Sequence, residues 1–141
     1  MRILIVNGVN LQQLGTREVA VYGALSFPEF LSGLRARYPS VRIDFYQSDL
    51  EGELARRIAQ AEGYAGIVLN AGAYTHTSVV LADAVRSTSC PVLEVHITNL
   101  FGREQYRRQS ALAPCCCGFI SGFGLDGYRL AVEAILEKNK G

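Results

Sequence analysis

Short runs rich in valine and isoleucine alternate with longer amphipathic segments five times along this chain of 141 residues. Such runs are typical of buried strands, and the amphipathic segments between them are typical of helices. Strand–helix alternation implies right-handed crossovers between parallel strands, which place helices on both faces of one sheet. The pattern therefore predicts an α/β fold with a five-stranded parallel sheet. We expect the flavodoxin-like strand order 2-1-3-4-5.

The expected strands cover residues 2–7, 41–46, 65–69, 92–95 and 115–120, and the expected helices cover residues 26–38, 51–62, 128–138 and a segment starting near 78. The first helix begins with Ser26-Phe-Pro-Glu29, which has the form of a capping box with proline in the first turn. Pro39 ends that helix. Because the chain contains no repeat or linker, we expect one flavodoxin-like domain over residues 1–141.

Composition excludes several classes of protein. A formal net charge of +1 gives no indication of a basic surface for nucleic acids or membranes. Residues 1–8 hold too short an apolar run for a signal peptide, and no stretch reaches the length of a membrane span. Cys90 and the triplet Cys115-Cys116-Cys117 lack the spacing of a disulfide framework or a CxxC metal clip. We expect reduced thiols, with the triplet in a buried strand, and therefore a cytoplasmic protein.

Each of the two histidines of the chain lies in a short polar segment that directly follows an apolar run. His76 lies in the polar segment 70–78, and His96 follows the run 91–95. Ligands of open parallel sheets bind beyond the carboxyl ends of the strands, so both imidazoles are expected at that edge. A hydrogen-bonded structural role would explain either histidine alone, but two at strand ends favour a site.

A long connection over residues 8–24 has no helical or strand periodicity. Connections of this length are often lids or binding loops. The alternative is an ordinary surface loop with no part in binding. This one contains Asn10, Arg17 and Tyr22, with several glycines around them.

Two further motifs are ambiguous by themselves. Arg103 and Arg107 are four residues apart, so on a helix they would share one face and could bind a carboxylate. A solvent-exposed basic face with no ligand would explain the same spacing equally well. Gly122-Phe-Gly124-Leu-Asp-Gly127 matches a dinucleotide-binding motif but follows the last strand, so we interpret it as a tight turn. With no metal-ligand spacing and no nucleophile elbow, the remaining groups suit metal-free proton transfer on a small polar anion.

Seven blocks of sequence, in this order, make the whole chain resemble type II 3-dehydroquinate dehydratases. The blocks are Asn7-Gly-Val-Asn-Leu with Leu14-Gly-Thr-Arg-Glu18 and Tyr22-Gly23, Gln47-Ser48 with Glu51-Gly-Glu53, Asn70-Ala-Gly-Ala-Tyr-Thr-His-Thr-Ser78, Glu94-Val-His96 with Asn99, Arg103-Glu104 with Arg107, Gly122-Phe-Gly124, and Gly127-Tyr128. The resemblance implies trans elimination of water from 3-dehydroquinate through an enolate, giving 3-dehydroshikimate, with neither metal nor organic cofactor.

The resemblance also implies a role for each matching residue. Tyr22 would remove the proton from C2, Arg17 would favour the tyrosinate, and Asn10 would stabilise the enolate through a water molecule. His96 would be the general acid for the C1 hydroxyl, oriented by Glu94. The substrate-binding groups would be Asn70, His76, Asp83, Ile97, Thr98 and Arg107, with Arg103 supporting the lid. Because Asp83 matches a position that reaches a neighbouring subunit, a trimer-based homo-oligomer, commonly a dodecamer, is implied.

The chain departs from the family pattern at positions without a named chemical role. Val9, Val19 and Ala71 stand where prolines are usual, Gln12-Gln13 replaces an Asn-Leu type pair, and Leu50 and Phe101 stand where histidines are common. Fewer prolines should loosen the lid and the turn after the third strand, which would affect turnover and affinity. A duplicate gene copy with altered substrate preference fits the same departures.

Two other functions compete with the enzyme. One is a binding module of the same fold that holds a small anion under a degraded lid, and the other is a nucleotide-binding flavodoxin-like protein. This chain lacks the phosphate-binding loop that the nucleotide-binding function would need. A binding module has no need for a base and an acid together, so Tyr22 and His96 favour the enzyme. The sequence does not distinguish a biosynthetic role from quinate breakdown.

Overall fold

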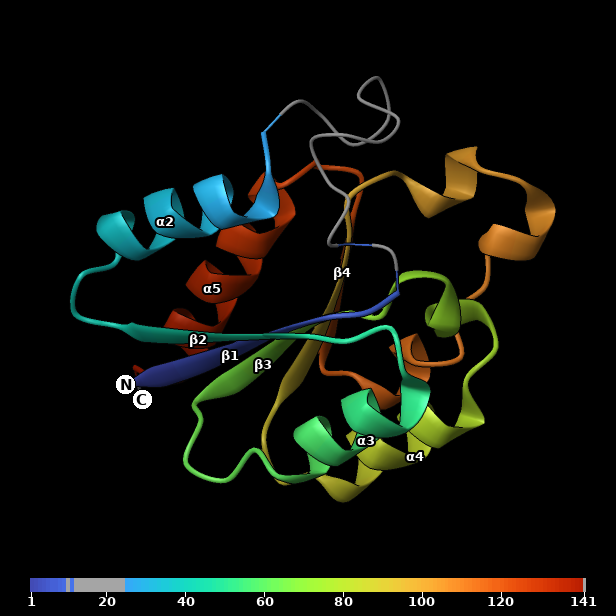
Figure 1. Ribbon diagram of the computed structural model, residues 1–141, viewed down its shortest axis with the longest axis horizontal. Helices are drawn as coiled ribbons and strands as arrows, with labels where there is room; N and C mark the ends of the chain where they lie inside the picture. The colour runs from blue at the N-terminus through green and yellow to red at the C-terminus, as the bar shows by residue number, and fades with distance from the viewer. Residues whose placement is uncertain (10, 12–24, 141) are drawn as a thin grey trace.

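The computed structural model, which describes residues 1–9, 11 and 25–140, contains one parallel sheet with helices on both faces (Figure 1). The strand order β2-β1-β3-β4-β5 confirms the predicted order. The strands are β1 (Arg2–Asn7), β2 (Arg42–Gln47), β3 (Gly66–Asn70), β4 (Val92–His96) and β5 (Gly118–Ser121). The helices are α2 (Phe27–Arg37), α3 (Glu51–Ala59), α4 (Val79–Ser87) and α5 (Asp126–Lys138).

Alternating side chains of the central strands supply two separate hydrophobic cores. On β1, Ile3 and Ile5 pack beneath α2 and α5, whereas Leu4 and Val6 pack against α3 and α4. Figure 1 shows these two helix pairs on opposite faces of the sheet. Strands buried on both sides in this way need near-continuous apolar sequence, which explains the runs seen in the chain.

The first helix begins as its sequence predicts. Ser26 is the N-cap of α2, and its Oγ accepts a hydrogen bond from the Glu29 backbone N–H at 3.3 Å. Ser78 caps α4 in the same way, because its Oγ accepts from the Leu81 N–H at 3.0 Å. Side-chain acceptors at these positions satisfy amides that the helix itself leaves unpaired.

The cysteine triplet does not form part of a strand, so that prediction was wrong. Cys115 ends the short 3-10 helix η5 (Ala113–Cys115), Cys116 is half-buried, and Cys117 is exposed just before β5. The chain turns here because Ser110 Oγ accepts hydrogen bonds from two successive amides and Pro114 follows within the turn. A run of apolar residues can therefore form a turn as well as a strand.

The chain ends lie together at the edge of the sheet opposite the carboxyl ends of the strands (Figure 1). Asn139, the C-cap of α5, donates from Nδ2 to the carbonyl of Ala65, the residue before β3. Within the described ranges, no helix is both long and apolar enough to cross a bilayer.

Tyr128 connects the last helix to the carboxyl ends of two strands. Its ring is fully buried at 5.0 Å from the Phe27 ring, and its hydroxyl donates to Asn7 Oδ1 at 2.7 Å. The same hydroxyl accepts from Asn70 Nδ2 at 2.9 Å. Burial raises the pKa of Tyr128, so the hydroxyl stays neutral and donates its proton to the amide.

Tyr128→Phe is expected to lower the free energy of unfolding by about 1–3 kcal/mol, because two buried amides lose a partner while the ring volume is retained. Urea denaturation monitored by circular dichroism measures this change. Tyr38→Phe is the matched control, since the Tyr38 hydroxyl bonds Glu133 at the surface and its loss should cost about 0.5 kcal/mol or less. Equal effects of the two variants would contradict the expectation.

Candidate active site

Polar side chains line the carboxyl edge of the sheet. The strand register places Asn7 beside Gln47 on one side and beside Asn70 on the other. His96, the last residue of β4, is paired with Ser121 of β5. His76 ends the 3-10 helix η2 (Gly72–His76), which follows β3 directly. Both histidines therefore lie at the edge where the sequence predicted them.

Gly8 lets the end of β1 approach the turn after β3 closely. Its N–H donates to the Asn70 carbonyl at 2.7 Å. A Cβ at position 8 would lie 2.3 Å from the carbonyl oxygen of Ala71, so no larger residue fits without moving the backbone. This close approach brings the start of the long connection next to the turn that leads to His76.

Glu94 and His96 form a buried pair on β4. Residues two apart on a strand project from the same face, and the Glu94 side chain is fully buried while His96 is 5% exposed. His96 Nε2 forms a hydrogen bond with Glu94 Oε2. A carboxylate only accepts, so this contact places a proton on Nε2 and leaves Nδ1 as the nitrogen for another partner.

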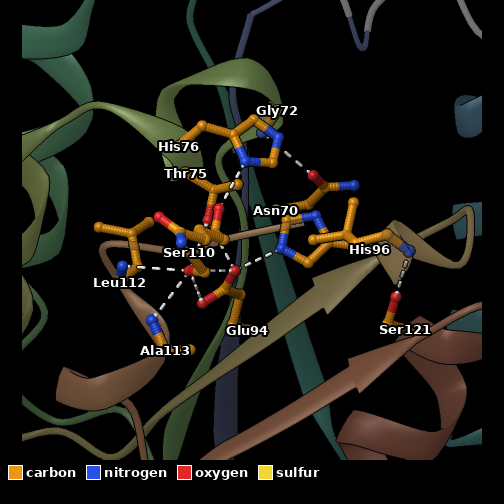
Figure 2. A network of polar contacts seen from close by, with 12 residues as sticks. Asn70, Gly72, Thr75, His76, Glu94, His96, Ser110, Leu112, Ala113 and Ser121 are labelled. Atoms are coloured by element: carbon orange, nitrogen blue, oxygen red, sulfur yellow. Dashed lines mark hydrogen bonds and ion pairs between the residues drawn. The ribbon is translucent and has the colours of Figure 1, made fainter. Parts of the chain in front are cut away.

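Thr75 and Ser110 also converge on the carboxylate, as Figure 2 shows. Thr75 Oγ1 donates to Glu94 Oε2 at 2.6 Å, and Ser110 Oγ lies 2.9 and 2.8 Å from the two carboxylate oxygens. Sequence reasoning missed both hydroxyl residues. No local pattern marks them, because the 3-10 helix η2 supplies one and the segment after β4 supplies the other.

His76 and Asn70 are each held by backbone groups. His76 Nδ1 lies 2.7 Å from the Gln109 carbonyl, which can only accept, so Nδ1 carries a proton. In the neutral ring, Nε2 then has the free lone pair. Asn70 Oδ1 accepts from the Gly72 N–H at 3.1 Å, and its Nδ2 donates to Tyr128. These contacts fix the orientation of both side chains at the sheet edge.

The segment after β4 is braced by Arg103 and Ser121. Arg103 Nη1 donates to Thr98 Oγ1 at 3.1 Å, and Ser121 Oγ donates to the Thr98 carbonyl at 3.0 Å. The Ile97 carbonyl accepts from the Gly124 N–H at 2.9 Å. Gly124 has φ 62°, which is consistent with the tight turn predicted for this glycine motif. Arg103 thus supports Thr98 directly.

Arg103 and Arg107 do not share a helical face, so the condition under which their spacing would place them side by side is not met. The 3-10 helices η3 (Leu100–Gly102) and η4 (Gln105–Arg107) are separated by extended backbone at Arg103, with φ −95° and ψ −174°. Glu104 lies between the two arginines and contacts Arg107 Nε at 2.6 Å and Arg103 Nε at 3.8 Å. Hydrogen bonding to Tyr106 and Arg107 holds the pKa of Glu104 below its usual value.

Asp83 lies apart from these groups. It is solvent-exposed on α4, the helix that also exposes Val79 and Val80. Asn10, Arg17 and Tyr22 lie outside the described residues, as do Gln12, Gln13 and Val19.

The described part of the chain contains no group of three or more histidine, cysteine or acidic side chains arranged to hold a metal ion. All four cysteines are free thiols. Burial raises the pKa of the Cys90 thiol to about 11. Burial, together with the nearby Glu94 carboxylate, raises the pKa of Cys116 to about 12.

Cys117 is therefore expected to react first with a thiol reagent at pH 8, and Cys90 and Cys116 last. A thiol with a pKa of 11 is ionised in only about one molecule in a thousand at that pH, and burial also blocks the reagent. Titration with Ellman's reagent before and after unfolding measures both classes. Cys117→Ser should remove the fast phase, whereas rapid reaction of every thiol in the folded protein would contradict this assignment.

Comparison with known proteins decides the family. A model described as "Dehydroquinase class II" matches residues 1–136. The chain belongs to the class II dehydroquinase family. It is 45% identical to a protein named 3-dehydroquinate dehydratase from Pelodictyon phaeoclathratiforme, over 96% of this chain and 92% of the relative. It is 48% identical to one of the same name from Exiguobacterium sp., over 97% of this chain and 95% of the relative.

A solved structure shares the fold throughout. The type II dehydroquinase from Butyrivibrio crossotus superposes with a TM-score of 0.93 at 38% identity, covering 96% of this chain and 97% of that one. Membership of this family and the flavodoxin-like architecture agree with the resemblance found in the sequence.

Proposed function

We propose that this protein is a 3-dehydroquinate dehydratase, a hydro-lyase that removes water from 3-dehydroquinate by trans elimination through an enolate. The observation that carries the proposal is the buried Glu94/His96 pair at the carboxyl edge of the sheet, in a chain of the class II dehydroquinase family. A buried carboxylate that orients an imidazole is a common arrangement for a proton donor or acceptor.

The proposed reaction begins with removal of a proton from C2, beside the ketone. Tyr22 would take this proton, with Arg17 favouring its ionised form and Asn10 stabilising the enolate; these roles follow from the resemblance. The enolate then re-forms the ketone and expels the C1 hydroxyl. His96 would donate a proton to that leaving oxygen, so one molecule of water departs and a conjugated enone remains.

The substrate would be held by the groups around this acid. Arg107 already binds a carboxylate, that of Glu104, and could exchange it for the carboxylate of the substrate with a similar charge-assisted geometry. Asn70, His76, Ile97 and Thr98 would hold the hydroxyls. Arg103, through its bond to Thr98, would maintain the position of this segment.

Addition of 3-dehydroquinate to the purified protein tests the proposal. Ultraviolet absorbance should rise as the conjugated enone forms, and the product should co-elute with 3-dehydroshikimate. A binding module would instead give heat of binding in a calorimeter without any absorbance change. If neither an absorbance change nor a heat of binding were observed, both functions would be excluded.

We also propose a trimer-based assembly, commonly a dodecamer, in a cytoplasmic protein, as the resemblance implies; the exposed Val79 and Val80 on α4 fit an interface on that helix. In such an assembly, Asp83 would lie at a neighbouring subunit's site and help to position its carboxylate-binding groups, while Val79 and Val80 would be covered.

Asp83→Ala is expected to lower kcat/KM by about tenfold while the protomer remains folded, because an interfacial carboxylate contact is worth more than an exposed one. Glu137→Ala, which removes an exposed carboxylate from α5, is the control and should leave kinetics unchanged. Sedimentation velocity of the unmodified protein should show trimers or multiples of them. A fully active monomer would contradict this assembly.

A further inference from the structure

Two of the hydrogen-bond donors around the Glu94 carboxylate, Thr75 and Ser110, do not themselves belong to the proposed chemistry. The carboxylate is fully buried and contacts the Thr75 hydroxyl, the Ser110 hydroxyl and His96 Nε2. A buried carboxylate without partners would be strongly unfavourable, so these donors decide whether Glu94 can remain ionised.

The Ser110 hydroxyl can act only as a donor toward Glu94. Its oxygen accepts hydrogen bonds from the backbone N–H groups of Leu112 at 3.1 Å and Ala113 at 2.9 Å. A hydroxyl oxygen has two lone pairs and one proton, so both lone pairs are occupied and the proton is left for the carboxylate. A protonated Glu94 would find no acceptor on Ser110, which favours the ionised form.

The Thr75 hydroxyl completes the arrangement. Its oxygen lies 2.6 Å from Glu94 Oε2 and 3.0 Å from Ser110 Oγ. Because the lone pairs of Ser110 are occupied, the proton of Thr75 also points to Glu94. Three donors then surround one carboxylate, and their directions fix its rotation about the side-chain axis.

Thr75 and the chain neighbours of Thr75 and Ser110 join the segments that carry the proposed substrate-binding groups. The Ala111 N–H donates to the Thr75 carbonyl at 2.7 Å, and His76, next to Thr75, donates to the Gln109 carbonyl. These contacts join η2 to the chain that follows Arg107. Through Thr75 and Ser110, the Glu94 side chain is therefore linked to the two segments that carry the proposed substrate-binding groups.

We infer that Thr75 and Ser110 are positioning residues that hold Glu94 ionised and oriented, so that a doubly protonated His96 ring keeps Nε2–H on Glu94 and presents Nδ1–H to the leaving hydroxyl. The inference rests on the proposed function of His96 as the general acid. Neither hydroxyl touches the substrate in this account, and both act through Glu94.

The test combines kinetics with nuclear magnetic resonance on the full-length protein. Ser110→Ala and Thr75→Val each remove one hydroxyl, and Thr75→Val keeps the branched side-chain volume. Each should lower kcat by about 10- to 100-fold, the range expected for loss of a hydrogen bond to a charged group, with KM changed by less than about threefold. Thr75→Ser and Ser110→Thr keep the hydroxyls and should restore most of kcat.

The spectroscopic readout is the Nε2 proton of His96, which should exchange slowly with solvent in the unmodified protein. The chain has two histidines, so His76→Asn leaves a single imidazole to assign. In Ser110→Ala and Thr75→Val this proton should move upfield and exchange faster. Ser87→Ala is the matched control, because the Ser87 hydroxyl donates to the Ala84 carbonyl on α4 and should affect neither readout.

Two outcomes would overturn the inference. One is unchanged kcat and an unchanged Nε2 proton in both hydroxyl-deletion variants, and the other is lower stability with both readouts intact, which would show a purely structural role. If the unmodified protein did not dehydrate 3-dehydroquinate, the proposed function would fail. The proton resonance would still report whether the hydroxyls hold Glu94 and His96 in place.

Discussion

Replacing His96 with asparagine is expected to lower kcat for 3-dehydroquinate by about 10²–10⁴-fold, the usual contribution of a general acid. Asparagine can still donate to Glu94 but cannot transfer a proton to the leaving hydroxyl. The fold should persist, because His96 lies at the end of β4 and contributes little apolar volume to either core. Steady-state kinetics with matched circular dichroism spectra measure the effect.

The effect of His76→Asn on kcat and KM is the comparison that decides which of the two histidines is the general acid. His76 is half-exposed and tied to a backbone carbonyl, without a buried carboxylate beside it. Its replacement should raise KM more than it lowers kcat, as expected for a binding group. If His76→Asn lost more kcat than His96→Asn, the assignment of the acid would have to be reversed.

Tyr22→Phe is expected to reduce kcat by a similar factor of about 10²–10⁴ while substrate binding is retained. Phenylalanine preserves the ring and removes only the group proposed to take the C2 proton. A tyrosine in water has a pKa near 10, so a base of this type needs a nearby cation, a role proposed for Arg17. Isothermal titration calorimetry can measure binding in the inactive variant.

Tyr38→Phe serves as the control for Tyr22→Phe, because the Tyr38 hydroxyl bonds Glu133 near the surface between α2 and α5. It should retain full turnover. Retention of more than about a tenth of kcat in Tyr22→Phe would exclude that residue as the base.

The fold was predictable because its signals are local and repeated. The continuous apolar run of β1 and the cap at Ser26 follow from residues close together in the sequence. The positions of His76 and His96 followed from the fold class and from the polar segments that directly follow two apolar runs. These features depend on residues that are near one another in the sequence, and little on the packing of distant segments.

Features that depend on contacts between distant segments were not predictable in the same way. Ser110 has no sequence pattern that distinguishes it from a surface serine, and its role appears only when the chain after β4 folds back on η2. The spacing of Arg103 and Arg107 would place them on one face of a helix, but the backbone at Arg103 is extended, and Glu104 contacts both guanidinium groups instead. The cysteine triplet was taken for a strand because apolar composition does not reveal the turn formed at Ser110 and Pro114.

The arrangement of the chain ends has a practical consequence for handling the protein. Both ends lie at the amino edge of the sheet, and the Glu94/His96 pair opens toward the carboxyl edge. An immobilising tag at either end would therefore attach to each protomer at the edge opposite its reactive edge. The proximity of the ends also suits circular permutation, because a short flexible linker could join them without disturbing the strands.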